Sequence, residues 1–166
     1  MASLGPEKKR SCEAYGSNIL CIFVEMDAKT VPMEIFDPLR RKNVKLTPEE
    51  GVRQGFVKWL ADTVKVPLPL MMSEYSFIFN GLKYRSDIVV FDRSLKPLAM
   101  VECKAPEVRL DNAVIDQVIR YNNVLKVKFI FITNGQLTYL CKWNQEAGKY
   151  EFSSEVPDYE TMLQTV

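Results

Sequence analysis

A capping box followed by a hydrophobic stripe predicts the first helix. Thr47 is the N-cap, Pro48 the first helical residue and Glu50 the glutamate three positions on. Apolar side chains then recur at helical spacing and give the helix one hydrophobic face. Because Pro67 prevents continuation, we expect this helix to span residues 48–65.

The hydrophobic pattern then changes to the period of strands. Glu74–Phe79 alternates, and Asn80-Gly81 is typical of a two-residue hairpin turn that leads back into Leu82. The next two runs, 88–91 and 98–101, are apolar on both faces, as expected of central strands that are covered on each side. The sequence thus predicts three antiparallel strands.

Helical spacing returns over residues 111–125, where Asp111 or Asn112 provides the cap. Two further strands are expected around a second hairpin turn, and these segments are 128–133, Asn134-Gly135 and 137–143. The order helix, three strands, helix, two strands predicts an α/β fold of the α+β type.

These elements define one domain over residues 33–150. Residues 1–32 lack sustained periodicity, so we expect a poorly ordered, peripheral N-terminal segment, with Met26 or Met33 as an alternative start. Residues 151–166 are expected to form a C-terminal tail.

Composition and charge restrict the classes of function. The chain has 166 residues, of which 47% are hydrophobic and 26% charged, enough for one core. Its 22 basic and 21 acidic side chains give a net charge of +1, so DNA contact requires a local patch or a partner. The apolar run Ile19–Val24 is too short to cross a membrane or to form a signal-peptide core. We expect a cytoplasmic protein without membrane partners.

The chain contains no histidine, and its four cysteines form no CxxC pair. This excludes mixed Cys/His zinc sites and catalysis by Ser/His or Cys/His pairs. The cysteine pattern fits a reduced, intracellular protein. Any catalysis must therefore use carboxylates, lysines, tyrosines or a bound metal.

The central hairpin predicts a pair of facing carboxylates. A turn closed by Asp92 and Pro97 makes these residues opposite partners: Phe91 with Leu98, Val89 with Met100, and Asp87 with Glu102. Opposed Cβ atoms lie roughly 4.5–5.5 Å apart, so both carboxylates can reach one divalent cation, which would relieve their repulsion. Lys104 points to the same face because strand side chains alternate.

This arrangement suits hydrolysis of phosphodiesters. Hard carboxylate oxygens bind Mg²⁺, for which Mn²⁺ is a substitute, and the lysine orients the nucleophile or neutralises developing charge. Gln117 and Tyr121 are further candidates, because they share one face of the second helix. The Cys103 backbone carbonyl is a candidate metal ligand. Glu49 or Glu50 offers a further carboxylate, and Glu50 is the candidate ligand of the two.

Purely structural interpretations stay open for each residue. Asp87 pairs equally well with Arg85 or Lys104 at a sheet end, and Glu102 with Lys104 is a common strand pattern. Gln117 and Tyr121 fit an ordinary helix edge, and Glu50 fits a capping residue. The cluster Arg40, Arg41 and Lys42 fits a solvated loop, or an edge that contacts DNA phosphates. The acids favour function because they adjoin apolar runs, where unpaired charge is costly.

The ordered motifs resemble the PD-(D/E)xK nuclease superfamily, in the branch with a QxxxY helix. They are Asp87, Glu102-Cys103-Lys104 and Gln117-Val118-Ile119-Arg120-Tyr121. Over residues 33–145 the chain looks like the N-terminal nuclease domain of type I restriction enzyme R subunits, in its small stand-alone form. The segments that carry this likeness are 36–42, 46–54, Val101-Glu102-Cys103-Lys104-Ala105-Pro106 and 116–122.

The resemblance implies a restriction-endonuclease-like αβββαβ core with a mixed central sheet flanked by helices. It implies Mg²⁺ bound at Asp87 and Glu102, catalysis by Lys104, help from Gln117 and Tyr121, and DNA as substrate. Two features depart from the family. Ser86 stands where the superfamily has proline, and the motor domains of an R subunit are absent from these 166 residues.

The resemblance therefore predicts a Mg²⁺-dependent DNA endonuclease of restriction-modification type. The missing motor points to partners, either other restriction or repair subunits or a second copy in a homodimer. Two alternatives stay open. One is a catalytically silent nucleic-acid-binding or assembly module of the same fold, and the other is an endonuclease that acts on RNA.

Overall fold

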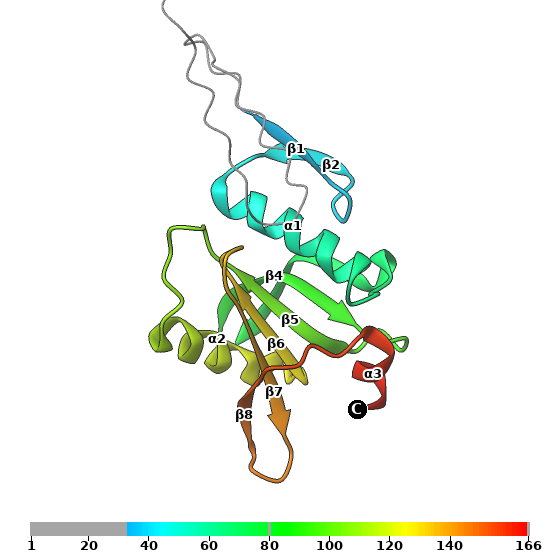
Figure 1. Ribbon diagram of the computed structural model, residues 1–166, viewed down its shortest axis with the longest axis vertical. Helices are drawn as coiled ribbons and strands as arrows, with labels where there is room; N and C mark the ends of the chain where they lie inside the picture. Colours follow the sequence, from blue (N-terminus) through cyan, green and yellow to red (C-terminus); the bar gives the residue numbers. More distant parts are fainter. Residues whose placement is uncertain (1–32, 80, 166) are drawn as a thin grey trace, which may run out of the picture. The chain divides into compact units, whose positions relative to one another are not determined.

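The computed structural model describes residues 33–79 and 81–165 (Figure 1), so the predictions for residues 1–32 lie outside the described residues. Helices and strands follow one another in this order: β1 Glu34–Asp37, β2 Lys42–Lys45, α1 Pro48–Asp62, a 3-10 turn Leu68–Leu70, β3 Met71–Phe79, β4 Leu82–Phe91, β5 Pro97–Cys103, α2 Asn112–Leu125, β6 Phe129–Thr133, β7 Thr138–Asn144, β8 Lys149–Ser153 and α3 Tyr159–Gln164.

A six-stranded mixed sheet forms the centre of the fold. Its strand order is β3-β4-β5-β6-β7-β8, and β1 with β2 forms a separate hairpin. Only β5 and β6 run parallel among the described strand pairs, and α2 is the crossover between them (Figure 1). The run α1, β3, β4, β5, α2, β6 confirms the predicted αβββαβ core with a mixed sheet.

The helices cover the two faces of the sheet. α1 and α3 pack on one face, where Leu60, Phe131 and Met162 belong to the same buried cluster. α2 packs on the other face, where Val118 meets Ile130 and Ile132. Because strand side chains alternate, Phe131 and Ile130 point to opposite layers, and a fully buried side chain of this size contributes about 1.5–3 kcal/mol.

The first helix begins as predicted and ends earlier. The Thr47 hydroxyl accepts the backbone N–H of Glu50 at 3.1 Å, which is half of a capping box. The helix ends at Asp62 and not at 65, because the chain turns through Lys65 at φ +65° and buries Val64 and Val66. Helical spacing alone could not show that these valines leave the helix.

The predicted register of the central hairpin is correct over three pairs, namely Ile88 with Val101, Val89 with Met100 and Val90 with Ala99. Phe91 pairs with Pro97 and not with Leu98, after a bulge. The cause is a tighter turn, in which Asp92 N–H donates to the Lys96 carbonyl and Leu95 adopts φ +59°. At the other end the ladder stops at Ile88, so the predicted pairing of Asp87 with Glu102 is not part of it.

The two remaining hairpins were predicted from Asn-Gly pairs. Phe79 pairs directly with Leu82 and Gly81 has φ +75°, as a two-residue turn requires, while Asn80 lies outside the described residues. The second turn is longer than predicted. Thr133 pairs with Thr138, and the four residues between them close through Asn134, whose side chain accepts two backbone N–H groups.

The predicted C-terminal tail over 151–166 is wrong, because this segment completes the domain. β8 pairs with β7, and α3 buries Tyr159 and Met162 in the core of α1. The Tyr159 hydroxyl also donates to the Phe91 carbonyl at 2.9 Å. Tyr159, Met162 and Leu163 follow the Asp158 cap at helical spacing, but the pattern covers little more than one turn and is too short to predict a helix securely. In the described part of the chain, no helix combines the length and the apolar character that crossing a membrane needs.

Candidate active site

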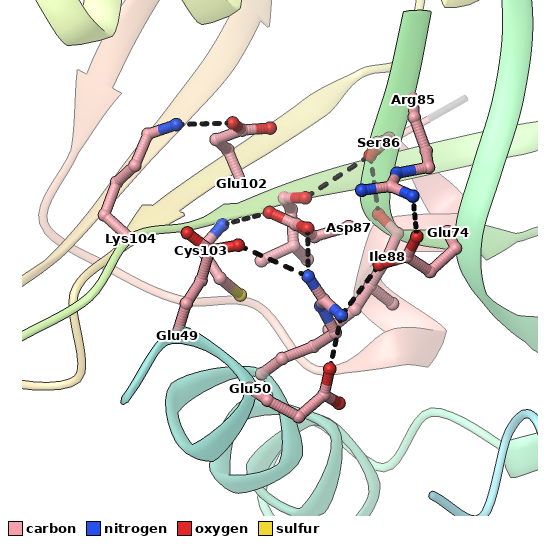
Figure 2. A network of polar contacts seen from close by, with 12 residues as sticks. Glu49, Glu50, Glu74, Arg85, Ser86, Asp87, Ile88, Glu102, Cys103 and Lys104 are labelled. Carbon is pink, nitrogen blue, oxygen red and sulfur yellow. Dashed lines mark hydrogen bonds and ion pairs between the residues drawn. The ribbon is translucent and has the colours of Figure 1, made fainter. Parts of the chain in front are cut away.

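Asp87 lies at a break in the hydrogen-bonding ladders on both sides of β4. On the β3 side, Ser73 pairs with Ile88 and Tyr75 pairs with Ser86, and the step between them carries no ladder pair. On the β5 side, the last ladder pair is Ile88 with Val101, so the ladder stops one residue short of Asp87. Its side chain bridges the gap, because Oδ2 accepts the backbone N–H of Cys103 at 2.7 Å (Figure 2).

Ser86 strengthens this junction. Its hydroxyl lies within hydrogen-bond distance of two carbonyl oxygens, those of Ile88 at 3.1 Å and Val101 at 3.3 Å. The second contact ties β4 to β5 beside Asp87. A proline at this position, as the superfamily pattern has, would lack the hydroxyl. The serine therefore gives the chain a side-chain tie between the two strands that carry the acids.

Glu102 and Lys104 lie together at the end of β5. Lys104 Nζ contacts Glu102 Oε1 at 2.7 Å (Figure 2). Burial, followed by the charge of Asp87, raises the pKa of Glu102, and the contact with Lys104 opposes this only in part. Burial alone would lower the pKa of Lys104, but the Glu102 contact outweighs it and raises that pKa. The charge of Asp87 thus acts on Glu102.

Glu49 and Glu50 at the start of α1 have different environments. Glu50 is buried and its oxygens are held by Arg40 at 2.6 Å, Arg53 at 2.7 Å and Gln54 at 2.8 Å. Glu49 has a side chain 47% exposed, and its charge raises the pKa of Glu102. The structure therefore places Glu49, and not the predicted ligand Glu50, toward the acid pair.

Three arginines and five carboxylates, among them Asp87 of the acid pair, form an ionic cluster. Figure 2 shows the part of it around Asp87. Arg53 of α1 is 4% exposed and contacts Asp87 at 2.7 Å. Arg40 contacts the fully buried Asp37, and Arg85 contacts Glu74. Burial alone would raise the pKa of Asp37, but its hydrogen bonds from Arg40 and Leu39 lower it overall. The ionic cluster comprises Arg40, Arg53, Arg85, Asp37, Glu49, Glu50, Glu74 and Asp87.

The predicted basic cluster is divided by this arrangement. Arg40 belongs to the ionic cluster and holds Asp37 and Glu50, so its guanidinium is not turned to solvent as the sequence suggests. Arg41 and Lys42 are exposed. Arg41 has φ +53° in the turn, and Lys42 is the first residue of β2. They are the two members of the predicted cluster whose side chains are exposed.

The helix motif lies on α2, where Gln117 is exposed. Tyr121 follows one helical turn later, but its side chain lies outside what the structure describes. The shared face of these two residues therefore stays a prediction from helical geometry.

The donor atoms at the acid pair are of the kind that Mg²⁺ prefers. Asp87 and Glu102 supply carboxylate oxygens, and Glu49 and the Cys103 carbonyl are the nearby oxygens that can complete a set. Around the site, six carboxyl groups meet four cationic side chains. No three His, Cys, Asp or Glu side chains among the described residues are already gathered as a metal cluster. The residues fit a divalent cation held by two carboxylates with help from backbone oxygen.

The family that describes the N terminus of type I restriction enzyme R proteins matches residues 48–157. The chain belongs to this family. The matched region runs from α1 through β8 and includes the carboxylates, Lys104 and the α2 motif. The β1–β2 hairpin with its basic turn lies outside it.

A solved structure supports the same fold for this R-protein N-terminal chain. A fragment described as an HsdR subunit of a type I restriction enzyme from Vibrio vulnificus YJ016 is similar with a TM-score of 0.52 and 19% identity. The similarity covers 72% of this chain and 25% of that one, so the chain spans a quarter of the Vibrio chain's length. A nuclease of the DUF820 group from Anabaena variabilis ATCC 29413 has a TM-score of 0.47 and 15% identity, over 81% and 86% of the two chains. No curated protein matches the chain.

A polar hollow of about 590 Å³ opens at the end of the sheet where β5 ends. The loop that follows Lys104 and the turn between β6 and β7 line it, and Arg109, Asn112 and Gln136 are among its polar residues. In this R-protein N-terminal domain, the hollow begins two residues after Lys104, at Pro106. Its lining includes none of Asp87, Glu102 and Lys104.

Proposed function

We propose that the chain is a Mg²⁺-dependent endonuclease that hydrolyses phosphodiester bonds in DNA. The observation that carries this proposal is the convergence of Asp87, Glu102 and Lys104 beyond the last ladder pair of β4 and β5 (Figure 2). Membership in the R-protein N-terminal family supports the same chemistry. An ammonium group beside a carboxylate pair suits phosphoryl chemistry because it offsets charge in the transition state.

Each residue has a role in this proposal. Asp87 and Glu102 hold the ion, with Glu49 and the Cys103 carbonyl as the further oxygens. When bound, Mg²⁺ would polarise a phosphoryl oxygen and acidify a water molecule. Lys104 orients the attacking water and offsets the charge that develops on the phosphate. Gln117 and Tyr121 support the site from α2.

The substrate surface includes two parts. Arg41 and Lys42 contact phosphates, which supplies the local positive charge that the net charge of +1 does not provide. The polar hollow after Lys104 receives the strand next to the scissile phosphate, with Arg109 and Gln136 as hydrogen-bond donors.

The description of the structural neighbour is the basis for proposing partners. The Vibrio protein is described as a subunit, and the present chain spans 25% of that chain. We propose that this domain works with other restriction or repair subunits, or as a homodimer, because double-strand cleavage needs two active sites or a partner. We place it in the cytoplasm, where DNA and these subunits meet.

The decisive experiment is a cleavage assay with purified protein on plasmid and linear DNA. Cleavage is expected with Mg²⁺ or Mn²⁺ and not with EDTA. Lys104→Ala should abolish cleavage and keep the fold, as judged by circular dichroism. Equal cleavage by Lys104→Ala and the wild type would rule out the proposed mechanism.

A second candidate is a catalytically silent module that binds nucleic acid or a partner. The observation that favours it is that both carboxylate oxygens of Asp87 already accept hydrogen bonds, one from Arg53 and one from the backbone N–H of Cys103. Titration calorimetry separates the two candidates. A silent module binds DNA without Mn²⁺-linked heat, whereas the nuclease binds Mn²⁺ and loses this heat in Glu102→Gln. A parallel screen of RNA substrates tests the RNA endonuclease.

A further inference from the structure

Arg53 is placed at the centre of the ionic cluster by contacts from three elements. Its Nη1 lies 2.7 Å from Glu50 and 2.8 Å from Glu74, and its Nη2 lies 2.7 Å from Asp87. The more distant Glu49 lies 3.5 Å from Nη2. The planar guanidinium suits this task because its terminal nitrogens hold several carboxylates in a fixed geometry. At 4% exposure, the side chain has no room to turn to solvent.

Glu74 has an unusual backbone for a strand residue. It has φ +57° within β3, a conformation that residues other than glycine, asparagine and aspartate rarely adopt. This conformation is strained and persists where surrounding contacts impose it. Its Oε1 contacts Arg53 at 2.8 Å, and Arg85 holds Oε2. The strained turn thus coincides with the missing ladder pair between Glu74 and Asp87.

The orientation of the Asp87 carboxylate depends on these contacts. The terminal torsion of an aspartate is broad, so the side chain needs two fixed partners to hold one orientation. The Cys103 N–H fixes Oδ2 and the Arg53 guanidinium fixes Oδ1, both at 2.7 Å. Each oxygen keeps a further lone pair for a cation. The positive charge of Arg53 is offset by the carboxylates around it, so it does not oppose a cation by itself.

We propose that Arg53 and Glu74 are positioning residues for Asp87, in which Glu74 holds Arg53 and Arg53 orients the carboxylate for a divalent cation. This inference rests on the proposed function of the site. The inference adds two residues, Arg53 and Glu74, to the site proposed for metal binding. In the described ion pairs, neither of them contacts Glu102 or Lys104.

A role in folding alone predicts a different result. If the contacts of Arg53 only stabilise the domain, substitutions lower its melting temperature but leave the Mn²⁺ affinity of the folded protein unchanged. Partners that orient metal-binding groups typically change metal affinity or activity about 10- to 100-fold when they are substituted. The affinity for Mn²⁺, measured directly, therefore separates positioning from stability.

The experiment compares Arg53→Lys and Glu74→Gln with the wild type, using Mn²⁺ binding followed by electron paramagnetic resonance and DNA cleavage in parallel. Lysine keeps the charge but lacks the two separate terminal nitrogens by which Arg53 contacts Glu74 and Asp87. Glutamine keeps one acceptor for Arg53. Both variants should bind Mn²⁺ about 10- to 100-fold more weakly. Lys58→Gln removes an exposed ion pair with Asp62 from the same helix and should bind Mn²⁺ as the wild type does.

Two outcomes contradict the proposals in different ways. Wild-type Mn²⁺ affinity in folded Arg53→Lys and Glu74→Gln overturns the positioning role and leaves the nuclease proposal intact. No Mn²⁺ binding by the wild type overturns the proposed function and this inference with it. If Arg53→Lys does not fold, Glu74→Asn decides the question, because asparagine tolerates the positive φ and lacks the length to reach Arg53 in the same way.

Discussion

The backbone N–H of Cys103 donates a 2.7 Å hydrogen bond to Oδ2 of Asp87. This bond continues the connection between β4 and β5 one step beyond their last ladder pair, through a side chain in place of a carbonyl. A hydrogen bond to a charged acceptor contributes about 1.5–3 kcal/mol. It also fixes the Asp87 carboxylate beside Cys103, the residue between Glu102 and Lys104. The candidate catalytic side chains are therefore attached to one hydrogen-bonded part of the backbone.

The two glutamates at the start of α1 should separate metal binding from stability. Glu49→Gln should lower Mn²⁺ affinity about 10-fold and change the free energy of unfolding by less than about 1 kcal/mol, because its ion pair is largely exposed. Glu50→Gln should destabilise the fold by about 3 kcal/mol, since Arg40 and Arg53 lose a buried partner. Urea unfolding and calorimetry with Mn²⁺ measure the two effects. Unchanged Mn²⁺ affinity in Glu49→Gln would remove this residue from the metal site.

Glu102 should make the metal-free protein less stable as the pH rises. Its folded-state pKa is raised by burial and by Asp87, so the folded protein favours the protonated form, and ionisation above that pKa costs stability. Glu102→Gln should therefore melt at a higher temperature than the wild type at pH 8 in EDTA. The difference should vanish below the ordinary glutamate pKa of 4.5, where both side chains are neutral. A lower melting temperature of the variant at pH 8 would contradict the raised pKa.

The affinity for Mn²⁺ should also depend on the protonation of Glu102, and it should rise with pH. The ion needs ionised Glu102, so affinity should fall as the pH decreases through the raised pKa, at a higher pH than for an ordinary glutamate. Calorimetric titrations between pH 4.5 and pH 8 measure this, within the range above the ordinary pKa. Affinity that stays constant over this range would show that Glu102 is not a ligand.

Among the glycines in the described turns, Gly135 should lose the most stability when it is replaced by alanine. It has φ +84°, and a Cβ there would lie 3.1 Å from Val52 Cγ2 on α1. Gly135→Ala should cost about 2–3 kcal/mol through both strain and overlap. Gly148→Ala is the matched control, because it has φ +62° but no atom within 4 Å, and should cost only the strain. Denaturant unfolding measures both, and Val52→Ala should restore part of the stability of Gly135→Ala. Equal losses in the two glycine variants would argue against the overlap.

Arg41 and Lys42 should contribute to DNA affinity through phosphates. The double substitution to alanine removes two phosphate contacts, so the slope of log affinity against log salt should become shallower by about 1.8. Fluorescence anisotropy at several salt concentrations measures this slope. Lys58→Ala is the control for an exposed lysine on α1. An unchanged slope in the double variant would place the DNA surface elsewhere.

Much of the fold could be predicted from local patterns. The cap at Thr47, the second helix with its cap at Asp111, and the register of Ile88 with Val101 follow from residue spacing and turn chemistry. Such features depend on contacts between residues that are close in sequence. The α3 helix and the bulge at Phe91 were missed, because burial of Tyr159 and the tight turn at Asp92 involve partners that the local pattern does not specify.

The sequence by itself determined that any catalysis must do without histidine, and it singled out Asp87, Glu102 and Lys104 as one group. Only the tertiary structure decided how this group is held. Arg53 of α1 contacts Asp87 and is itself contacted by Glu74 of β3, and Glu49 rather than Glu50 lies toward the acid pair (Figure 2). The physical reason is that a strand period fixes which side chains share a face, whereas the balance of buried charges depends on residues far apart in the chain.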